Sequence, residues 1–175
     1  MKLSEVKVGE LFTVGGLELI KFSEENGKTV AVAKDCVFSS SFGSNNNFAE
    51  SSILERLNKE VLPKLEEAAG AENILEFETD LTSLDGLKTY GSMTSKIGIP
   101  TFDFYRNNVG IFDKYKLDCW WWLATSDTTP EHYNDSWCRC VSPVGCISDV
   151  SYYYYGGVRP FCIFVSSISV SCEEE

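Results

Sequence analysis

The last third of this chain differs in composition from the rest, and this difference constrains the fold more than any other feature. Residues 117–175 contain no Lys, all four Trp and five of the eight Tyr. Their basic residues are Arg139 and Arg159, set against eight acidic residues. WWWLAT at 120–125 and VRPFCIFV at 158–165 are rich in aromatic and β-branched residues, which predicts buried strands. Any function assigned to the chain must explain the missing Lys.

Length and charge limit the classes of protein to which this chain can belong. The 175 residues suit one domain, 1–175, and 43% hydrophobic with 23% charged residues is ordinary globular usage. The net charge of −11 disfavours nucleic acid as a partner, because that partner selects basic surfaces. No apolar run reaches the ~18 residues of a membrane span, so we expect no membrane insertion. The N-terminal MKLSEVKVGELF lacks the apolar core of a signal peptide, so we expect synthesis in the cytoplasm without Sec export.

The first seventy residues predict two strands and a broken helix. Residues 10–22 and 28–38 show partial alternation of apolar and polar residues and read as strands. Ser52 and Glu55 have the spacing of a capping box, which predicts the start of a helix. Pro63 predicts a break near Leu62, and Gly70 predicts the end of the helix. The expected apolar stripe is Leu54, Leu57, Val61, Leu65 and Ala68.

The rest of the chain predicts irregular structure and then more strands. Residues 71–116 read as a packed, irregular segment with short helical pieces, one of them over 82–87. Two short strands are expected on either side of the turn at 143–145. The final residues, 173–175, read as a solvated tail.

Catalytic and metal-binding signals are weak. The one histidine, His132, lies in a turn-like stretch, and we expect an exposed loop residue. A zinc site of His132 with Cys138, Cys140 and Cys146 lacks the paired C-x2-C spacing of zinc-binding clusters. The odd number of seven Cys predicts free thiols in a reducing compartment. We therefore expect no catalytic residue, no cofactor and no metal.

Residues 126–157 have the composition of a recognition surface. They contain five Tyr, five Ser and three Asp without any Lys, and Tyr with Ser dominates binding loops. The run Tyr152–Tyr155 places Tyr on both alternating faces of an extended segment, so about half of these rings must be exposed. The alternative is an aromatic strand or loop packed on the domain. Composition alone does not decide between these two interpretations.

Three segments resemble a known family. NNFAESSILERLNKEVLP at 46–63 resembles an N-x-F/Y-x-x-S-x-I-x-x-W-L-N signature, WWWLAT at 120–125 resembles W-W-L-R-T/S, and GGVRPFCIF at 156–164 resembles G-V-R-P-A/F. Together they are similar to C-type-lectin-like domains of gut bacteria and their phages, which include the variable proteins of diversity-generating retroelements. The resemblance implies an α+β, C-type-lectin-like fold, with a small twisted antiparallel sheet, one or two flanking helices and long loops. Ala124 departs from the pattern, where the family often has Arg.

The resemblance also implies a division of the chain into a scaffold, 1–125 and 156–172, and a candidate variable display region, about 126–155. In variable members a reverse transcriptase rewrites adenines, so Asn codons become Tyr, Asp, Ser, Cys and others but never Lys, Glu or Trp. Trp120–Trp122, Glu131 and Trp137 would then be scaffold, and Arg159 would satisfy backbone carbonyls or an acid inside the fold. The implied ligand-binding residues are Tyr133, Asn134, Asp135, Ser136, Cys138, Cys140, Ser142, Cys146, Ser148, Asp149, Ser151, Tyr152, Tyr153, Tyr154 and Tyr155.

The implied function is calcium-independent binding of a macromolecular ligand, a protein or a cell-surface receptor, by a phage-tail or bacterial-surface protein that is not an enzyme. One alternative is a fixed structural or adhesion module of a phage or cell surface. Another is a thiol oxidoreductase of the formylglycine-generating type, using Cys138, Cys140 or Cys146, or a hydrolase using His132.

Overall fold

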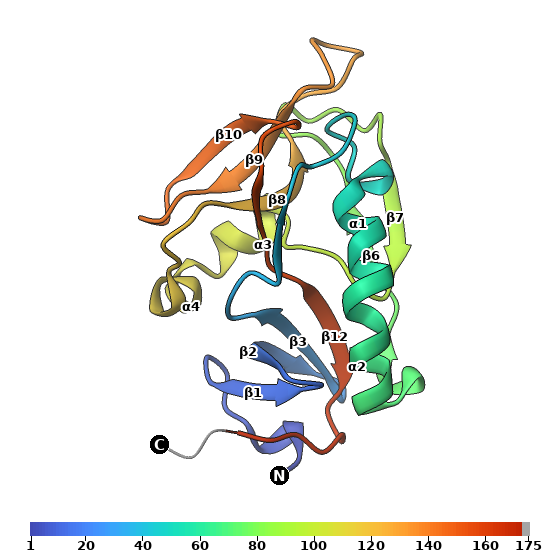
Figure 1. Ribbon diagram of the computed structural model, residues 1–175, viewed down its shortest axis with the longest axis vertical. Helices are drawn as coiled ribbons and strands as arrows, with labels where there is room; N and C mark the ends of the chain where they lie inside the picture. The colour runs from blue at the N-terminus through green and yellow to red at the C-terminus, as the bar shows by residue number, and fades with distance from the viewer. Residues whose placement is uncertain (173–175) are drawn as a thin grey trace.

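The computed structural model describes residues 1–172; residues 173–175, predicted as a solvated tail, lie outside the described residues. The chain is an α+β protein in which two sheets lie one above the other, and a long broken helix runs along one side of both (Figure 1). The two ends of the described chain lie together at the lower sheet, where the Leu3 amide donates to the Ile168 carbonyl at 2.9 Å. Among the described residues, no helix has the length and apolar character needed to cross a membrane.

The lower sheet joins strands from both ends of the sequence, in the spatial order β1, β2, β3, β12, β5, and all of its pairings are antiparallel. The strand expected over 10–22 is divided by a turn at 15–16 into β1 and β2, and the strand expected over 28–38 ends at Ala33 as β3. The strands are β1 (Leu11–Val14), β2 (Leu17–Glu25), β3 (Lys28–Ala33), β5 (Ile74–Leu75) and β12 (Phe161–Val165).

The upper sheet, in the order β10, β9, β8, β11, β4, takes four strands from the C-terminal third and its edge strand β4 from near residue 40. Its pairings are antiparallel except that of β11 with β8, which is parallel. The two short strands expected around 143–145 are confirmed as the hairpin β9–β10. The strands are β4 (Phe38–Ser40), β8 (Trp121–Ser126), β9 (Trp137–Val141), β10 (Ile147–Ser151) and β11 (Gly156–Val158). A separate pair is formed by β6 (Phe77–Asp80) and β7 (Ser92–Ser95).

The long helix breaks where the sequence predicts. It consists of α1 (Ser52–Arg56), a π-helical turn (Leu57–Val61) and α2 (Leu62–Ala69), and Gly70 ends it at φ +89°. Pro63 explains the break, because it has no N–H to donate back along the helix. The prediction of Ser52 as the cap is wrong by one residue: the Oγ of Ser51 accepts from the Leu54 amide at 3.0 Å.

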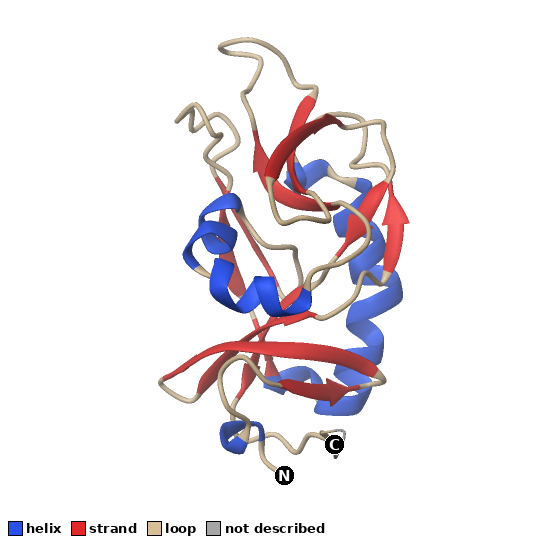
Figure 2. Cartoon of the chain, turned by 90° about the vertical axis from the view of Figure 1, so that its left-hand side faces the viewer, coloured by secondary structure: helices blue, strands red, loops and turns tan. Residues whose placement is uncertain are grey.

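Short helices cover the space between the sheets, namely α3 (Phe102–Asn107) and α4 (Val109–Phe112) (Figure 2). These are the short helical pieces expected in the irregular segment. The helical turn expected over 82–87 is wrong, because this stretch contains no helix. Ser83 supplies the physical reason: its Oγ accepts from the Leu87 amide at 3.0 Å and its carbonyl accepts from the Gly86 amide at 2.9 Å, which closes a tight loop in place of a helix.

The buried core passes from the lower sheet to the upper one. Leu19, Ile53 and Trp122 are all fully buried in one cluster, although they come from β2, α1 and β8. Arg159 is also buried, and its Nε donates to the Ala33 carbonyl at 3.0 Å while its guanidinium lies over the Trp121 ring. The expectation that Arg159 satisfies backbone carbonyls inside the fold is confirmed. It ties β3 to the turn between β11 and β12.

Candidate recognition surface

The display region, residues 126–155, lies at the end of the molecule that contains β8, β9, β10 and the loops that join them (Figure 1). Most of the fifteen predicted binding residues reach solvent there. The exposed ones are Tyr133, Asp135, Cys146, Ser148, Asp149, Tyr153, Tyr154 and Tyr155. The half-buried ones are Asn134, Ser136, Ser142 and Tyr152.

Three of the predicted residues do not belong to the exposed surface. Cys138, Cys140 and Ser151 are 0%, 1% and 2% exposed. Cys138 and Cys140 alternate on β9 and therefore share one face, as expected, but that face packs on the core that contains Trp122. The prediction that these positions display side chains to a ligand is therefore corrected for all three.

The tyrosine turn, residues 152–155, combines a fixed backbone with exposed rings. The Tyr152 amide donates to the Ser136 carbonyl at 2.9 Å, and the Tyr152 carbonyl accepts from the Phe42 amide at 2.8 Å. The exposed fractions of Tyr153, Tyr154 and Tyr155 are 60%, 54% and 72%, and the first two rings stack at 4.9 Å. The packed-strand interpretation is thus excluded for these three rings.

A glycine fixes the end of this turn. A Cβ placed on Gly156 would overlap the ring of Trp120, so the residue after the tyrosines must be small. The next amide, that of Gly157, donates to the Trp120 carbonyl at 3.1 Å. The three exposed rings therefore project from a turn whose two ends are bonded to β8, β9 and the segment near Phe42.

The loop between β8 and β9 is held by Asn46, which is fully buried. Its side-chain Nδ2 donates to the Thr128 carbonyl at 2.9 Å and to the Trp137 carbonyl at 3.1 Å. Its backbone amide donates to the Asp135 carbonyl at 2.7 Å. The hydroxyl of Tyr90 donates to its Oδ1. The composition of this segment gives no sign that Asn46 is the buried anchor. The signal that could have found it is Asn46 as the first residue of the helix signature.

The tip of the same loop carries His132 and Tyr133, and Tyr133 is 75% exposed. His132 is an exposed loop residue, as expected, and its Nδ1 lies 2.7 Å from the Oδ2 of Asp85. Burial raises the pKa of Asp85, but hydrogen bonds from Ser83, Thr128 and His132 outweigh it and hold the pKa at about 2. This contact joins the loop to the 82–87 segment, and the Thr128 hydroxyl lies 3.5 Å from the same His132 nitrogen.

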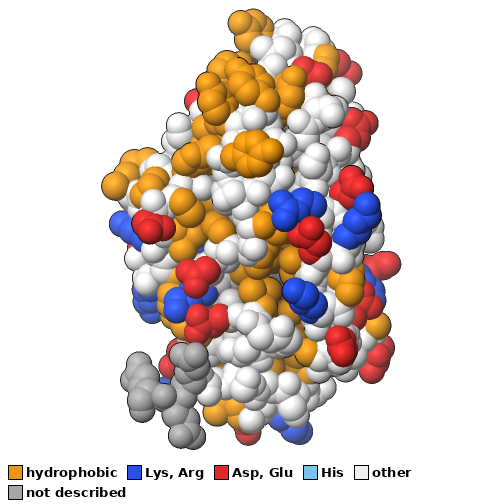
Figure 3. Space-filling view, in the orientation of Figure 1, with side chains coloured by type: hydrophobic (Ala, Val, Ile, Leu, Met, Phe, Trp, Pro, Cys, Tyr) orange, Lys and Arg blue, Asp and Glu red, His pale blue; other side chains and the backbone are white. Residues whose placement is uncertain are grey.

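Charge on this surface is acidic. Arg139 is the sole basic residue in 126–155, and its Nε lies 2.6 Å from the Oδ1 of Asp127. Burial and the neighbouring Asp149 raise the pKa of Asp127 to about 6, although Arg139 opposes them. Figure 3 shows hydrophobic and acidic side chains over this end of the molecule, with Lys and Arg only further down. The surface therefore presents aromatic rings and carboxylates.

The thiols of β9 are poorly suited to nucleophilic chemistry. Burial raises the pKa of the Cys138 thiol far above its ordinary value and that of Cys140 to about 11. Thiolate is the reactive form, so little of it exists at either residue near neutral pH.

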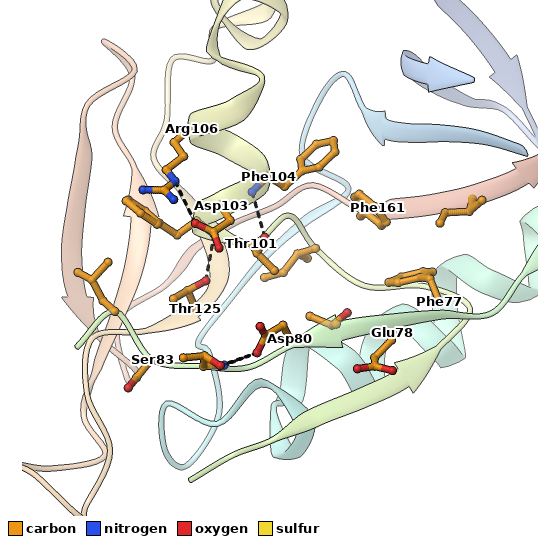
Figure 4. Close-up of a pocket in the computed structure, with 16 residues that line it drawn as sticks. Phe77, Glu78, Asp80, Ser83, Thr101, Asp103, Phe104, Arg106, Thr125 and Phe161 are labelled. Atoms are coloured by element: carbon orange, nitrogen blue, oxygen red, sulfur yellow. Dashed lines mark hydrogen bonds and ion pairs between the residues drawn. The ribbon is translucent and has the colours of Figure 1, made fainter. Parts of the chain in front are cut away.

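A cleft of about 570 Å³ lies away from the tyrosine turn, between β6, α3 and β12 (Figure 4). Phe77, Phe104 and Phe161 form one end, where Phe161 meets the other two rings at 4.9 and 5.1 Å. The opposite end carries Asp80 and Asp103, and Figure 4 shows Arg106 bonded to Asp103. The sequence gives no sign of this cleft, because the cleft unites segments that are far apart in the chain.

No protein-family model matches the chain, and neither a curated protein nor a solved structure matches it. The geometry of the surface and the motifs in the sequence are therefore what a proposal rests on.

Proposed function

We propose that this chain is a calcium-independent ligand-binding protein of C-type-lectin-like fold, the variable protein of a diversity-generating retroelement, located on a phage tail or a bacterial cell surface. Its partner is a macromolecular ligand, a protein or cell-surface receptor. The fold assignment rests on the helix, W-W-L and G-V-R-P motifs, and the α+β architecture with small sheets, one long helix and long loops is compatible with it.

One observation supports binding above the others: three exposed Tyr rings stand on a backbone that is hydrogen-bonded at Tyr152 and closed by Gly156 against Trp120. Tyr supplies a large, rigid contact area at low entropic cost, and exposed aromatic groups of this kind are typical of interaction sites. A surface whose side chains project from a fixed backbone can change its residues without disturbing the fold. This is the property that a diversified protein needs.

The absence of Lys from the display region agrees with rewriting at Asn codons, which cannot produce Lys. A genomic observation tests this directly. We expect the neighbouring DNA to carry a near-copy of codons 125–160 that differs mainly at adenines, together with a reverse transcriptase gene. If neither is present, the fixed adhesion module is the better explanation.

A binding experiment tests the surface itself. The variant with Tyr153, Tyr154 and Tyr155 all changed to Ser is compared with the wild type and with Val8→Ser, an exposed residue outside the display region. Each fluorescently labelled protein is incubated with a panel of intact bacterial cells. We expect the triple variant to lose cell binding while its free energy of unfolding changes by less than about 1.5 kcal/mol. Unfolding of the triple variant, or retained binding, would contradict the proposal.

A further inference from the structure

The cleft between β6, α3 and β12 has the size and lining of a small-molecule site. Its volume of about 570 Å³ lies within the range of roughly 300–1,000 Å³ that is usual for such sites. No residue of the display region lines it, although Thr125, which does, is the neighbour of Ser126 on β8. Nothing in the proposed binding function uses it.

The apolar end of the cleft offers three aromatic side chains that a flat ring of a ligand can contact. Phe77, Phe104 and Phe161 come from β6, α3 and β12, and each of them is only half-buried. Their rings meet edge to face, at interplanar angles of 63° and 90° for the two pairs that Phe161 makes. An aromatic ligand would extend this arrangement, because edge-to-face contacts add attraction beyond the area buried.

The polar end of the cleft carries an excess of negative charge. Its acidic residues are Glu78, Asp80 and Asp103, and Arg106 is the one basic residue among the described residues that line it. Asp80 accepts from both the amide and the hydroxyl of Thr82, at 2.9 and 2.6 Å, and the hydroxyl and amide bonds lower its pKa. Asp103 already forms an ion pair, because its Oδ1 lies 2.9 Å from the Nε of Arg106. Asp80 is thus an ionised carboxylate that forms no ion pair among the described residues, although the charge of nearby Lys88 also lowers its pKa.

We propose that this cleft binds a small organic cation, an ammonium group carried a short distance from an aromatic ring. The ring lies against Phe77, Phe104 and Phe161, and the ammonium group lies between Asp80 and Asp103. An anion of the same shape is repelled by the carboxylates, and a neutral analogue gains only the contact with the rings.

Three probes with one ring system separate these contributions: tryptamine, the neutral tryptophol and the anionic indole-3-propionate. Binding to the full chain is measured by isothermal titration calorimetry at low salt. We expect one saturable site for tryptamine, with tryptophol bound about tenfold more weakly, corresponding to one lost charge interaction of ordinary strength, and indole-3-propionate bound more weakly still. Equal affinities for the three probes, or no saturable tryptamine site, would overturn the proposal.

Charge variants locate the site. Asp80→Asn keeps the oxygen that accepts from Thr82 while it removes the charge, so we expect about threefold to tenfold weaker tryptamine binding without a change in stability. Arg106→Ala frees Asp103 from its ion pair, so we expect tighter binding, a change that damage to the fold would not produce. Asp118→Asn removes the same charge from an exposed residue outside the cleft and is the matched control. If Asp118→Asn weakens binding as much as Asp80→Asn, the attraction belongs to the whole acidic protein and the proposal fails.

Discussion

Asn46 holds Trp137 across 91 residues of sequence, by a hydrogen bond of 3.1 Å from its buried side-chain amide to the Trp137 carbonyl. The same nitrogen also donates to the Thr128 carbonyl. The two carbonyls lie near the opposite ends of the loop that carries Tyr133. A residue in the N-terminal half therefore sets the shape of a loop in the display region.

Asn46→Ala should lower the free energy of unfolding by about 2–3 kcal/mol, because it leaves buried carbonyls and the Tyr90 hydroxyl without their partner. Urea unfolding measures this change, and hydrogen exchange should speed up over residues 126–137. Asn107→Ala, at an exposed Asn of α3, is the control and should stay within about 0.5 kcal/mol of the wild type. Equal effects of the two variants would show that Asn46 has no special role.

Burial divides the predicted display positions into those that tolerate substitution and those that do not. Two substitutions to Asn test this division. Cys138→Asn places an amide in the core beside Trp122, so we expect a loss of at least about 2 kcal/mol of stability. Ser148→Asn, on the neighbouring strand β10, changes an exposed residue and should cost less than about 0.5 kcal/mol. Thermal and urea unfolding give both values. If Cys138→Asn is tolerated as well as Ser148→Asn, the buried face of β9 is free to vary after all.

The fold could be predicted from sequence where the signals are local. Alternation locates β1 to β3, and Pro63 and Gly70 locate the break and the end of the long helix. The aromatic runs locate β8 and β12, because bulky β-formers are favoured only where a sheet buries them. These features depend on neighbours within a few residues.

The candidate site could be predicted only in part, because burial on β9 depends on pairing across the sheet. The sequence places Cys138 and Cys140 on one face but does not say which face meets the core. Asn46 and the cleft have no local signal, since each depends on segments that come together only in the folded chain. The exposed Tyr153 to Tyr155 could be predicted, because a run of four identical large residues must present some of them to solvent.

The Asp127 carboxyl makes stability depend on pH. Burial and Asp149 raise its pKa to about 6, against about 3.9 in an unfolded chain. Between these values the folded protein holds a proton that the unfolded chain has lost, so this group's contribution is fully present below about pH 4 and is lost as the pH rises through 6. The Asp127→Asn variant has no carboxyl at this position, so its stability lacks this dependence on pH.

The free energy of unfolding of Asp127→Asn, relative to the wild type, should therefore rise between pH 4 and pH 6.5, by on the order of 2 kcal/mol. Urea unfolding at a series of pH values measures the difference. Asp118→Asn, at an exposed residue, should give a flat difference over the same range. A difference that falls with pH for Asp127→Asn would mean that Arg139, and not burial, dominates the pKa of this carboxyl.

Cys36 and Cys119 lie next to each other, with their Sγ atoms 3.9 Å apart, although 83 residues separate them in sequence. Cys119 is exposed, so an oxidant reaches this pair directly. Diamide should take two electrons and two protons from the two thiols, leaving a disulfide between them and the reduced hydrazine. Closing a loop of this length should raise the free energy of unfolding by about 2–4 kcal/mol.

Peptide mapping after one equivalent of diamide checks this prediction, and the linked peptide should contain Cys36 and Cys119. Cys119→Ser should abolish both the link and the added stability, whereas Cys172→Ser should change neither. The thiols of Cys138, Cys140 and Cys162 should stay reduced, because they are buried and the oxidant does not reach them. A first link formed by Cys146 or Cys172 instead would show that accessibility alone, and not the proximity of two thiols, decides which residues are oxidised.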